Sequence, residues 1–237
     1  MSFKRNVVVT FLPAAVLLLL SAVSFASGDA VKPEAALRAS FPQLQFDSIS
    51  PSEITGLYEV VSGQNILYYY PAKDLMVSGD IFGKDLKNHT AERKGALAAK
   101  LVKDLPLDKA VKIGAGKHVV IEFTDPDCPF CRKASEYFTK RTDVTRYVFF
   151  APLAHPAAIT KIQYILGAQN KAEAYDAMML GQEIPASAKP ATEAIKALAQ
   201  EHLALAKKVG IQGTPTFFIK DQQVMGADTN KLDELLK

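Results

Sequence analysis

The sequence is poor in several features that would each point to a particular class of protein. Only two of its 237 residues are cysteine, and there is no tryptophan. Two cysteines form at most one disulfide, which excludes a small scaffold held together by several bridges. Charge of one sign is also scarce, because 28 Lys and Arg stand against 25 Asp and Glu, a net charge of +3. So weak and mixed a charge gives no reason to expect nucleic acid as a partner.

Apolar residues, in contrast, are plentiful. Hydrophobic residues make up 49% of the chain and charged residues 22%. An intrinsically disordered chain would be poor in apolar residues, so that class is excluded. The length is sufficient for one or two folded domains.

A long apolar run occurs near the N-terminus. Lys4 and Arg5 precede the almost wholly apolar run 7–20, and Ser24-Phe25-Ala26 follows it with small residues at its outer positions. These three parts are typical of a secretory signal peptide. The alternative is an uncleaved anchor, but the run is short for a membrane span of about 20 residues. We therefore expect cleavage near Ala26 and export to the periplasm, with no membrane contact after cleavage. Disulfides are stable in such an oxidising compartment.

The first part of the chain after the signal has the pattern of a small mixed domain. A short helix is predicted over 31–40, with Pro33 in its first turn. β-Branched and aromatic runs separated by turn residues then predict antiparallel strands at 56–61, 66–70 and 75–77. A unit of this size is marginally stable alone and often needs a partner. Acidic residues exceed basic ones up to about residue 88, and the reverse holds after it, so we place a boundary there.

The remainder alternates strands and helices, which predicts an α/β fold. A helix over 90–105 has a thin apolar stripe, which favours a linker between domains over a core helix. After it, strands and helices are predicted as follows: strands 119–123, 147–150, 216–219 and 222–225; helices 129–140, 157–168, 171–180, 190–209 and 230–236.

Both cysteines lie together in the segment Cys128-Pro129-Phe130-Cys131, after one predicted strand and at the start of a helix. The free N–H groups of a helix N-terminus favour a thiolate at the first cysteine. Cys128 is therefore predicted to be the exposed nucleophile, and Cys131, one turn on, to resolve a mixed disulfide. A zinc half-site or an inert local disulfide is less consistent with the sequence. Zinc normally takes four ligands, and a bridge across four residues adds little stability.

Two further features of the sequence lie outside this segment. Gly213-Thr214-Pro215 comes directly before the predicted strand 216–219. Glu122 lies six residues before Cys128, on a strand expected to be buried. Burial raises the pKa of a carboxyl group. An edge glutamate facing solvent, or one paired with Lys117, is the alternative.

Residues 119–133 together with Gly213-Thr214-Pro215-Thr216-Phe217 resemble the thioredoxin-fold disulfide oxidoreductases. Thr before the proline, and the order of the segments, resemble the periplasmic disulfide isomerases of the DsbC/DsbG type. In that family the proline is cis and packs against the two cysteines, and its neighbouring backbone pairs with substrate. The resemblance implies catalytic roles for Cys128, Cys131 and Glu122, with Glu122 accepting the proton of Cys131. It also implies substrate contacts, which would be made by Thr214, Pro215, Pro129 and Phe130.

The resemblance also implies the domain organisation. After the signal peptide, 1–26, it predicts a small α+β dimerisation domain over 27–88 and a linker helix over 89–110. A thioredoxin-like catalytic domain follows over 111–237, with a helical insertion at about 155–209. The implied activity is that of a dimeric disulfide isomerase or reductase that repairs wrong disulfides in exported proteins.

The resemblance also implies partners and cofactors. The substrates would be misoxidised or unfolded exported proteins, and a membrane reductase of the DsbD type would keep Cys128 reduced. No metal and no cofactor is expected beyond a redox-active disulfide between Cys128 and Cys131. The Pro-Phe dipeptide leaves open a DsbG-like reductase of sulfenic acids or a DsbA-like oxidase. A chaperone that holds unfolded chains, or a secretion accessory, is an alternative of another class.

Overall fold

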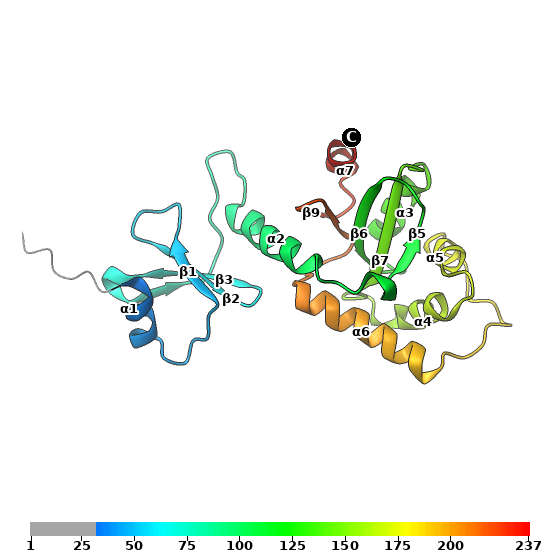
Figure 1. The fold of residues 1–237 in the computed structure, drawn as a ribbon, viewed down its shortest axis with the longest axis horizontal. Coiled ribbons are helices and arrows are strands. Elements are labelled where there is room, and N and C mark those ends of the chain that lie inside the picture. The colour runs from blue at the N-terminus through cyan, green and yellow to red at the C-terminus, as the bar shows by residue number, and fades with distance from the viewer. Residues whose placement is uncertain (1–31) are drawn as a thin grey trace, which may run out of the picture.

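Two β-sheets connected by one long helix organise residues 32–237, the part of the chain that the computed structural model describes (Figure 1). The predicted signal peptide, 1–26, lies outside the described residues. Within residues 32–237, the helices are all too short or too polar to cross a membrane.

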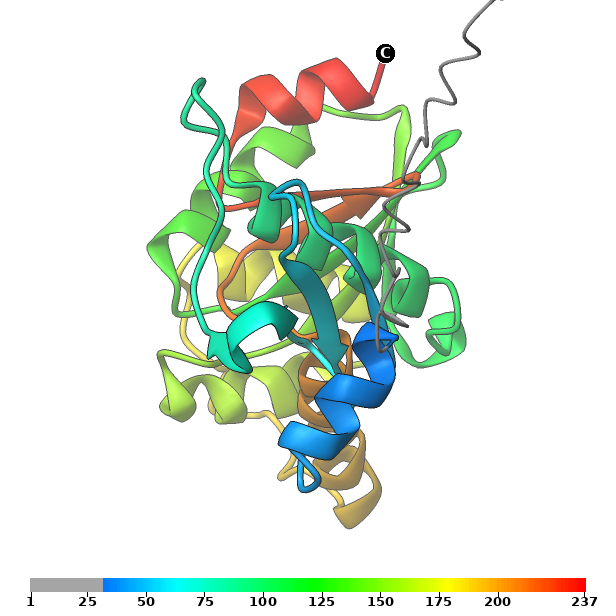
Figure 2. The same cartoon turned by 90° about the vertical axis from the view of Figure 1, so that its left-hand side faces the viewer.

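The N-terminal sheet is antiparallel and has the strand order β1-β2-β3-β4. The elements of this part are α1 (Pro33–Ser40), β1 (Ser48–Pro51), β2 (Tyr58–Ser62), β3 (Asn65–Tyr70), a 3₁₀ turn (Pro71–Lys73) and β4 (Leu75–Val77). Helix α1 lies over one face of the sheet, where Leu37 is buried with Val60 and Tyr69 (Figure 2). Pro33 occupies the first turn of α1, as the sequence predicts.

The second sheet has the strand order β5-β7-β6-β8-β9. Its strands are β5 (Val111–Ile113), β6 (His118–Thr124), β7 (Val144–Phe150), β8 (Thr216–Ile219) and β9 (Gln222–Met225). Strands β6 and β7 are parallel, while β5, β8 and β9 join antiparallel. Helices alternate with these strands along the chain, so the predicted α/β fold is confirmed.

Helices cover both faces of this sheet. They are α2 (His89–Val102), α3 (Pro129–Thr139), α4 (Ile159–Gly167), α5 (Lys171–Met179), α6 (Glu193–Val209) and α7 (Thr229–Leu235), with 3₁₀ turns at Leu107–Lys109 and Pro156–Ala158. On β6, Val120 faces α3 and α7, and Phe123 faces α2 and α6. Helix α6, predicted as part of an insertion, therefore also covers one face of the sheet.

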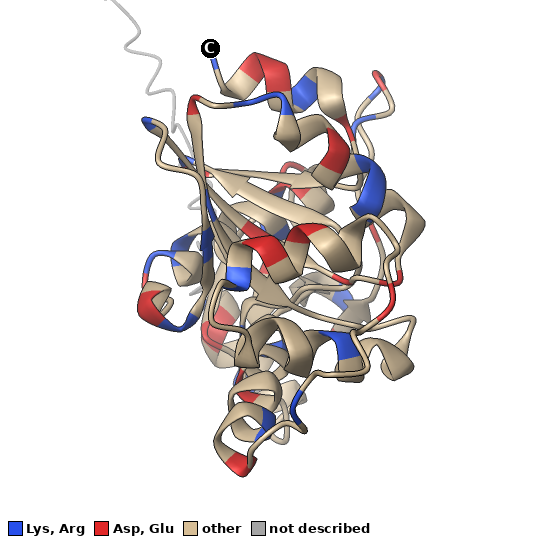
Figure 3. Cartoon of the chain, turned by 90° about the vertical axis from the view of Figure 1, so that its right-hand side faces the viewer, with Lys and Arg blue, Asp and Glu red and all other residues tan. Residues whose placement is uncertain are grey.

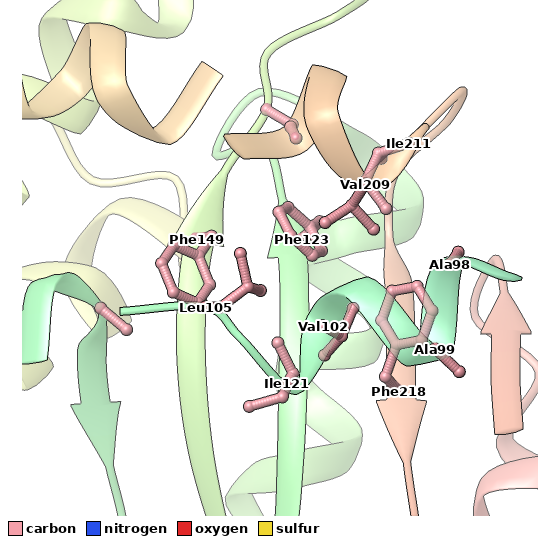
Figure 4. Close-up of a cluster of buried hydrophobic side chains, with 13 residues drawn as sticks. Ala98, Ala99, Val102, Leu105, Ile121, Phe123, Phe149, Val209, Ile211 and Phe218 are labelled. Carbon is pink, nitrogen blue, oxygen red and sulfur yellow. The ribbon is translucent and has the colours of Figure 1, made fainter. Parts of the chain in front are cut away.

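Helix α2 is more than a linker, and this corrects the prediction from its thin apolar stripe. Ala98, Ala99 and Val102 are buried in one cluster with Phe123 and Phe149 (Figure 4). Two of these α2 residues are alanines, whose small side chains let the helix approach the sheet closely but give a weak hydrophobic pattern in the sequence. The C-terminal half of α2 is part of the core of the second domain.

Two strands were missed by the sequence analysis, and both are short. Strand β1 has the sequence Ser-Ile-Ser-Pro and β5 has Val-Lys-Ile. Each depends on pairing with a neighbour, β1 with β2 and β5 with β7, rather than on its own residues.

Charges of both signs are distributed over the second domain. Seen from that end of the molecule, segments with Lys or Arg alternate with segments with Asp or Glu (Figure 3). The distribution of charged residues along the ribbon in this view agrees with the even balance of charge in the sequence.

Candidate active site

The two cysteines lie at the junction of β6 and α3, as predicted. Cys128 is the N-cap residue of α3, Pro129 occupies its first turn, and Cys131 lies one turn further. Only 6% of Cys128 and none of Cys131 is exposed, while Phe130 between them is 64% exposed. Cys128 is therefore less exposed than predicted. Both cysteines are free thiols in the structure.

Thr214 lies next to Cys128 and is hydrogen-bonded to it. Its carbonyl oxygen accepts a hydrogen bond from Sγ of Cys128 at 3.4 Å, and the peptide bond between Thr214 and Pro215 is cis. The two segments meet because β8 pairs with β6, with Thr216 opposite Phe123. The start of β8 thus lies beside the end of β6, where the cysteines follow. The structure brings together Cys128, Cys131, Thr214 and Pro215 as the sequence analysis expected.

Cys131 lies in an apolar environment with two hydroxyl groups. Burial raises the pKa of its thiol, while the side chains of Thr124 and Thr214 act in the opposite direction. The Thr124 hydroxyl is fully buried and has no hydrogen-bond partner among the described residues, and it lowers the pKa of the neighbouring Cys131 thiol. Burial therefore keeps Cys131 a protonated thiol, and the two threonine hydroxyls can donate to its sulfur when it ionises.

Glu122 is fully buried, as predicted, and both of its carboxylate oxygens accept hydrogen bonds. Arg146 donates to Oε2 at 3.1 Å and the hydroxyl of Tyr175 donates to Oε1 at 3.0 Å. Burial, with the charge of Glu122 as a second cause, raises the pKa of Tyr175, so its phenol stays a donor. Lys117, the partner considered from the sequence, is not involved in these bonds.

Arg146 was missed by the sequence analysis although the sequence contains a signal for it. One of the two covered faces of β7 carries Val144, Arg146, Val148 and Phe150, so a single charge interrupts an apolar alternation. A charge at such a position needs a buried partner. Glu122 on the neighbouring strand provides it, and the guanidinium also packs over the ring of Phe138 at 4.9 Å.

The comparisons with known proteins agree with this geometry. Residues 105–230 match the family described as thioredoxin-like domain, and residues 24–91 match the disulfide bond isomerase protein N-terminal domain. A probable thiol:disulfide interchange protein DsbC of Bordetella avium is 32% identical over 196 residues, which are 81% of this chain and 68% of the relative. The chain belongs to the DsbC family of thiol:disulfide interchange proteins.

Other relatives extend the DsbC comparison. The thiol:disulfide interchange protein DsbC of Salmonella typhimurium is 28% identical over 208 residues, 84% of each chain. A variant of Proteus mirabilis ScsC has a TM-score of 0.51 at 23% identity, over 60% of this chain and 82% of that one, and shares the fold. As a member of the DsbC family, the chain is a thiol-disulfide oxidoreductase with a thioredoxin fold.

The sequence analysis also missed the residues that hold the loop before Cys128. The loop Asp125-Pro126-Asp127 connects β6 to Cys128, and its two carboxylates are bound by side chains from other elements. Since two of these partners, His155 and Lys161, come from beyond β7, only the parallel pairing of β6 and β7 brings them to the loop. No local sequence pattern contains that information.

Proposed function

We propose that the chain is a periplasmic disulfide isomerase and reductase that acts as a homodimer on misoxidised exported proteins. The observation that carries the proposal is the position of Cys128. It is the N-cap residue of α3, and its Sγ donates to the carbonyl of Thr214. Membership of the DsbC family and the predicted signal peptide, 1–26, support the compartment and the substrate class. The exchange needs no cofactor besides the disulfide that Cys128 and Cys131 form.

The reaction begins when the thiolate of Cys128 attacks one sulfur of a wrong substrate disulfide. A mixed disulfide forms between Cys128 and the substrate, and the other substrate sulfur leaves as a thiolate. In isomerisation, another substrate thiol attacks the mixed disulfide and releases Cys128. In reduction, Cys131 attacks the sulfur of Cys128, the substrate leaves reduced, and a disulfide joins Cys128 and Cys131.

The burial of Cys131 suits this sequence of steps. Because burial raises the pKa of its thiol, Cys131 remains protonated until the mixed disulfide forms, and substrate thiols have time to rearrange. Its proton must leave when it attacks, and Glu122 is the acceptor that we propose. Each Glu122 oxygen accepts one hydrogen bond, so the carboxylate has further lone pairs that can take that proton.

The substrate chain would lie along the edge that carries Thr214. Phe130, which is largely exposed beside the cysteines, offers an apolar contact, as an unfolded substrate requires. Pro129 and Pro215 shape the surface on either side of Cys128. Each reductive turnover leaves the disulfide in place, so a membrane reductase of the DsbD type is needed to restore the thiols.

The N-terminal domain, 27–88, is proposed to form the dimer, which its match to the N-terminal domain of disulfide bond isomerases supports. Strand β4 is an edge of its sheet, and Leu75 and Val77 are 52% and 47% exposed there. Phe82 and Leu86, in the segment that follows, are also exposed. An exposed apolar edge of this kind is a surface that a second copy can cover.

Refolding of scrambled ribonuclease tests the proposed activity. The protein should restore native ribonuclease in a weakly reducing glutathione buffer, and Cys128→Ala should abolish the effect. Cys131→Ala should accumulate mixed disulfides with the substrate while it retains part of the isomerase activity. Equal recovery with the wild-type chain and with Cys128→Ala would instead favour a chaperone that holds unfolded chains.

A further inference from the structure

The loop that delivers Cys128 to the active site contains a buried carboxylate. Asp125 directly follows β6 and is fully buried. The backbone N–H of Asp127 donates to its Oδ1 at 2.9 Å, and Nδ1 of His155 lies 2.8 Å from its Oδ2. An ionised carboxylate only accepts hydrogen bonds, so Nδ1 of His155 carries the proton in this pair. His155 is therefore a side chain that donates a hydrogen bond to the buried carboxylate.

Asp125 is connected to Cys128 through the backbone as well. Its carbonyl oxygen accepts the N–H of Cys128 at 3.1 Å, so the turn that its side chain stabilises is the turn that positions the thiol. The second carboxylate of the loop, Asp127, has partners of its own. Lys161 of α4 donates to it at 2.5 Å and Arg132 of α3 at 3.3 Å. The contact of His155 with Asp125 is thus a separate constraint on the loop.

We propose that His155 is a positioning residue for Cys128, acting through Asp125. The inference rests on the proposed function, in which Cys128 is the nucleophile. Without His155, the backbone N–H of Asp127 is the donor that remains to the Asp125 carboxylate, and Oδ2 of this buried group loses its hydrogen bond. A carboxylate whose charge is less well stabilised, three residues before Cys128, disfavours a thiolate there, and the turn that holds Cys128 loses part of its support. The thiolate of Cys128, and with it the reduced state of the pair, becomes less stable.

Two variants separate the hydrogen bond of His155 from its bulk. His155→Gln places its amide beyond the position of Nδ1, while His155→Asn places an amide N–H near that position. His89→Ala is the matched control, because Nδ1 of His89 lies 3.0 Å from Oε1 of Glu53, in the other domain. The two histidine side chains are similarly exposed, 33% for His89 and 38% for His155.

Two measurements report on Cys128 directly. One is the rate at which iodoacetamide alkylates Cys128 of the reduced protein at a fixed, slightly acidic pH, followed by mass spectrometry. The other is the equilibrium in which two glutathione thiols reduce the disulfide between Cys128 and Cys131 and leave as oxidised glutathione. We expect His155→Gln to slow alkylation by roughly threefold to tenfold and to disfavour reduction by a similar factor. His155→Asn should restore both values to within about twofold, and His89→Ala should change neither.

The possible results are distinguishable. If His155→Gln matches the wild-type chain and His89→Ala in both measurements, the inference is wrong. The same holds if His155→Asn is as impaired as His155→Gln, because the donor at the Nδ1 position would then be irrelevant. A wild-type chain that does not exchange with glutathione at all would overturn the proposed function itself. Thermal unfolding of each variant confirms that the compared proteins are folded.

Discussion

The carbonyl oxygen of Thr214 accepts a hydrogen bond from Sγ of Cys128 at 3.4 Å, and the side chain of the same residue acts on Cys131. One residue therefore acts on both cysteines through different groups. Its backbone carbonyl accepts the hydrogen bond of the nucleophile Cys128, and its side chain lowers the pKa of the resolving Cys131. Substitution of the side chain should consequently affect the two halves of the reaction unequally.

Thr214→Val should slow reduction more than isomerisation. The hydroxyl of Thr214 lowers the pKa of Cys131 against the effect of burial, and valine removes it while it preserves the shape and the carbonyl. Resolution of the mixed disulfide by Cys131 should slow by roughly threefold to tenfold, since a hydrogen bond contributes about 1 kcal/mol. Gel analysis under acid quench should show more mixed disulfide. Thr160→Val is the control, because the Thr160 hydroxyl donates to the carbonyl of Ala157 in its own segment, and it should behave as wild type.

Removal of either partner of the Glu122–Arg146 pair should destabilise the protein strongly. Both side chains are buried and 3.1 Å apart, so Glu122→Leu or Arg146→Leu alone leaves an uncompensated charge and should cost about 3–5 kcal/mol. The double variant should cost less than the sum of the two single changes. Urea denaturation at neutral pH measures all three values, and strict additivity would show that the two charges are not coupled.

Acid should weaken the fold through His202. Its Nδ1 accepts the N–H of Phe150 and its Nε2 donates to the carbonyl of Lys109, which requires the neutral ring. Burial lowers the pKa of His202 from 6.5 to about 4. The unfolded chain therefore binds the proton more readily than the folded one between these values, and stability falls as the pH decreases through that window.

The loss due to His202 should approach about 3 kcal/mol by pH 4. His202→Gln should be less stable than wild type at pH 7 because it cannot make both bonds, but its free energy of unfolding should vary less between pH 7 and pH 4.5. Urea denaturation at the two pH values measures the difference. An unchanged slope in the variant would assign the acid sensitivity to other groups.

Leu75→Lys combined with Val77→Lys should produce a monomer. The change places two charges on the exposed edge strand β4, where a second copy is proposed to dock, and charged edges resist pairing. Sedimentation velocity should show a dimer for the wild-type chain and a monomer for the variant, with isomerase activity reduced. Leu180→Lys is the control, because Leu180 is 73% exposed but belongs to the catalytic domain. A variant that remains dimeric would exclude β4 from the interface.

Much of the fold could be predicted from the sequence because its signals are local. The helix that begins at Pro129, the strand before it and the hairpin of β8 and β9 each follow from residues adjacent in the chain. The same is true of the juxtaposition of the two cysteines at a helix N-terminus. The position of Thr214 was correct only because of the resemblance to a family, since the residues alone indicate no more than a turn there.

The features that the sequence did not reveal depend on contacts between distant segments. Arg146 reaches Glu122 because β7 lies beside β6, and His155 reaches Asp125 for the same reason. The role of α2 was misjudged because its buried face carries small residues, among them Ala98 and Ala99, which give only a weak hydrophobic pattern. Which distant residues come into contact depends on the register of the strands and on the size of the side chains between packed elements.

The packing of α2 also determines where the chain can be divided. A catalytic fragment that begins at residue 111, after the predicted linker, would lack Ala98, Ala99 and Val102 and would expose the rings of Phe123 and Phe149 that they cover. Such a fragment should aggregate, whereas one that begins at Asn88, the N-cap of α2, retains a closed core. The independent folding unit thus starts more than twenty residues upstream of residue 111, the start that the family resemblance implies, and close to the boundary that the charge pattern places near residue 88.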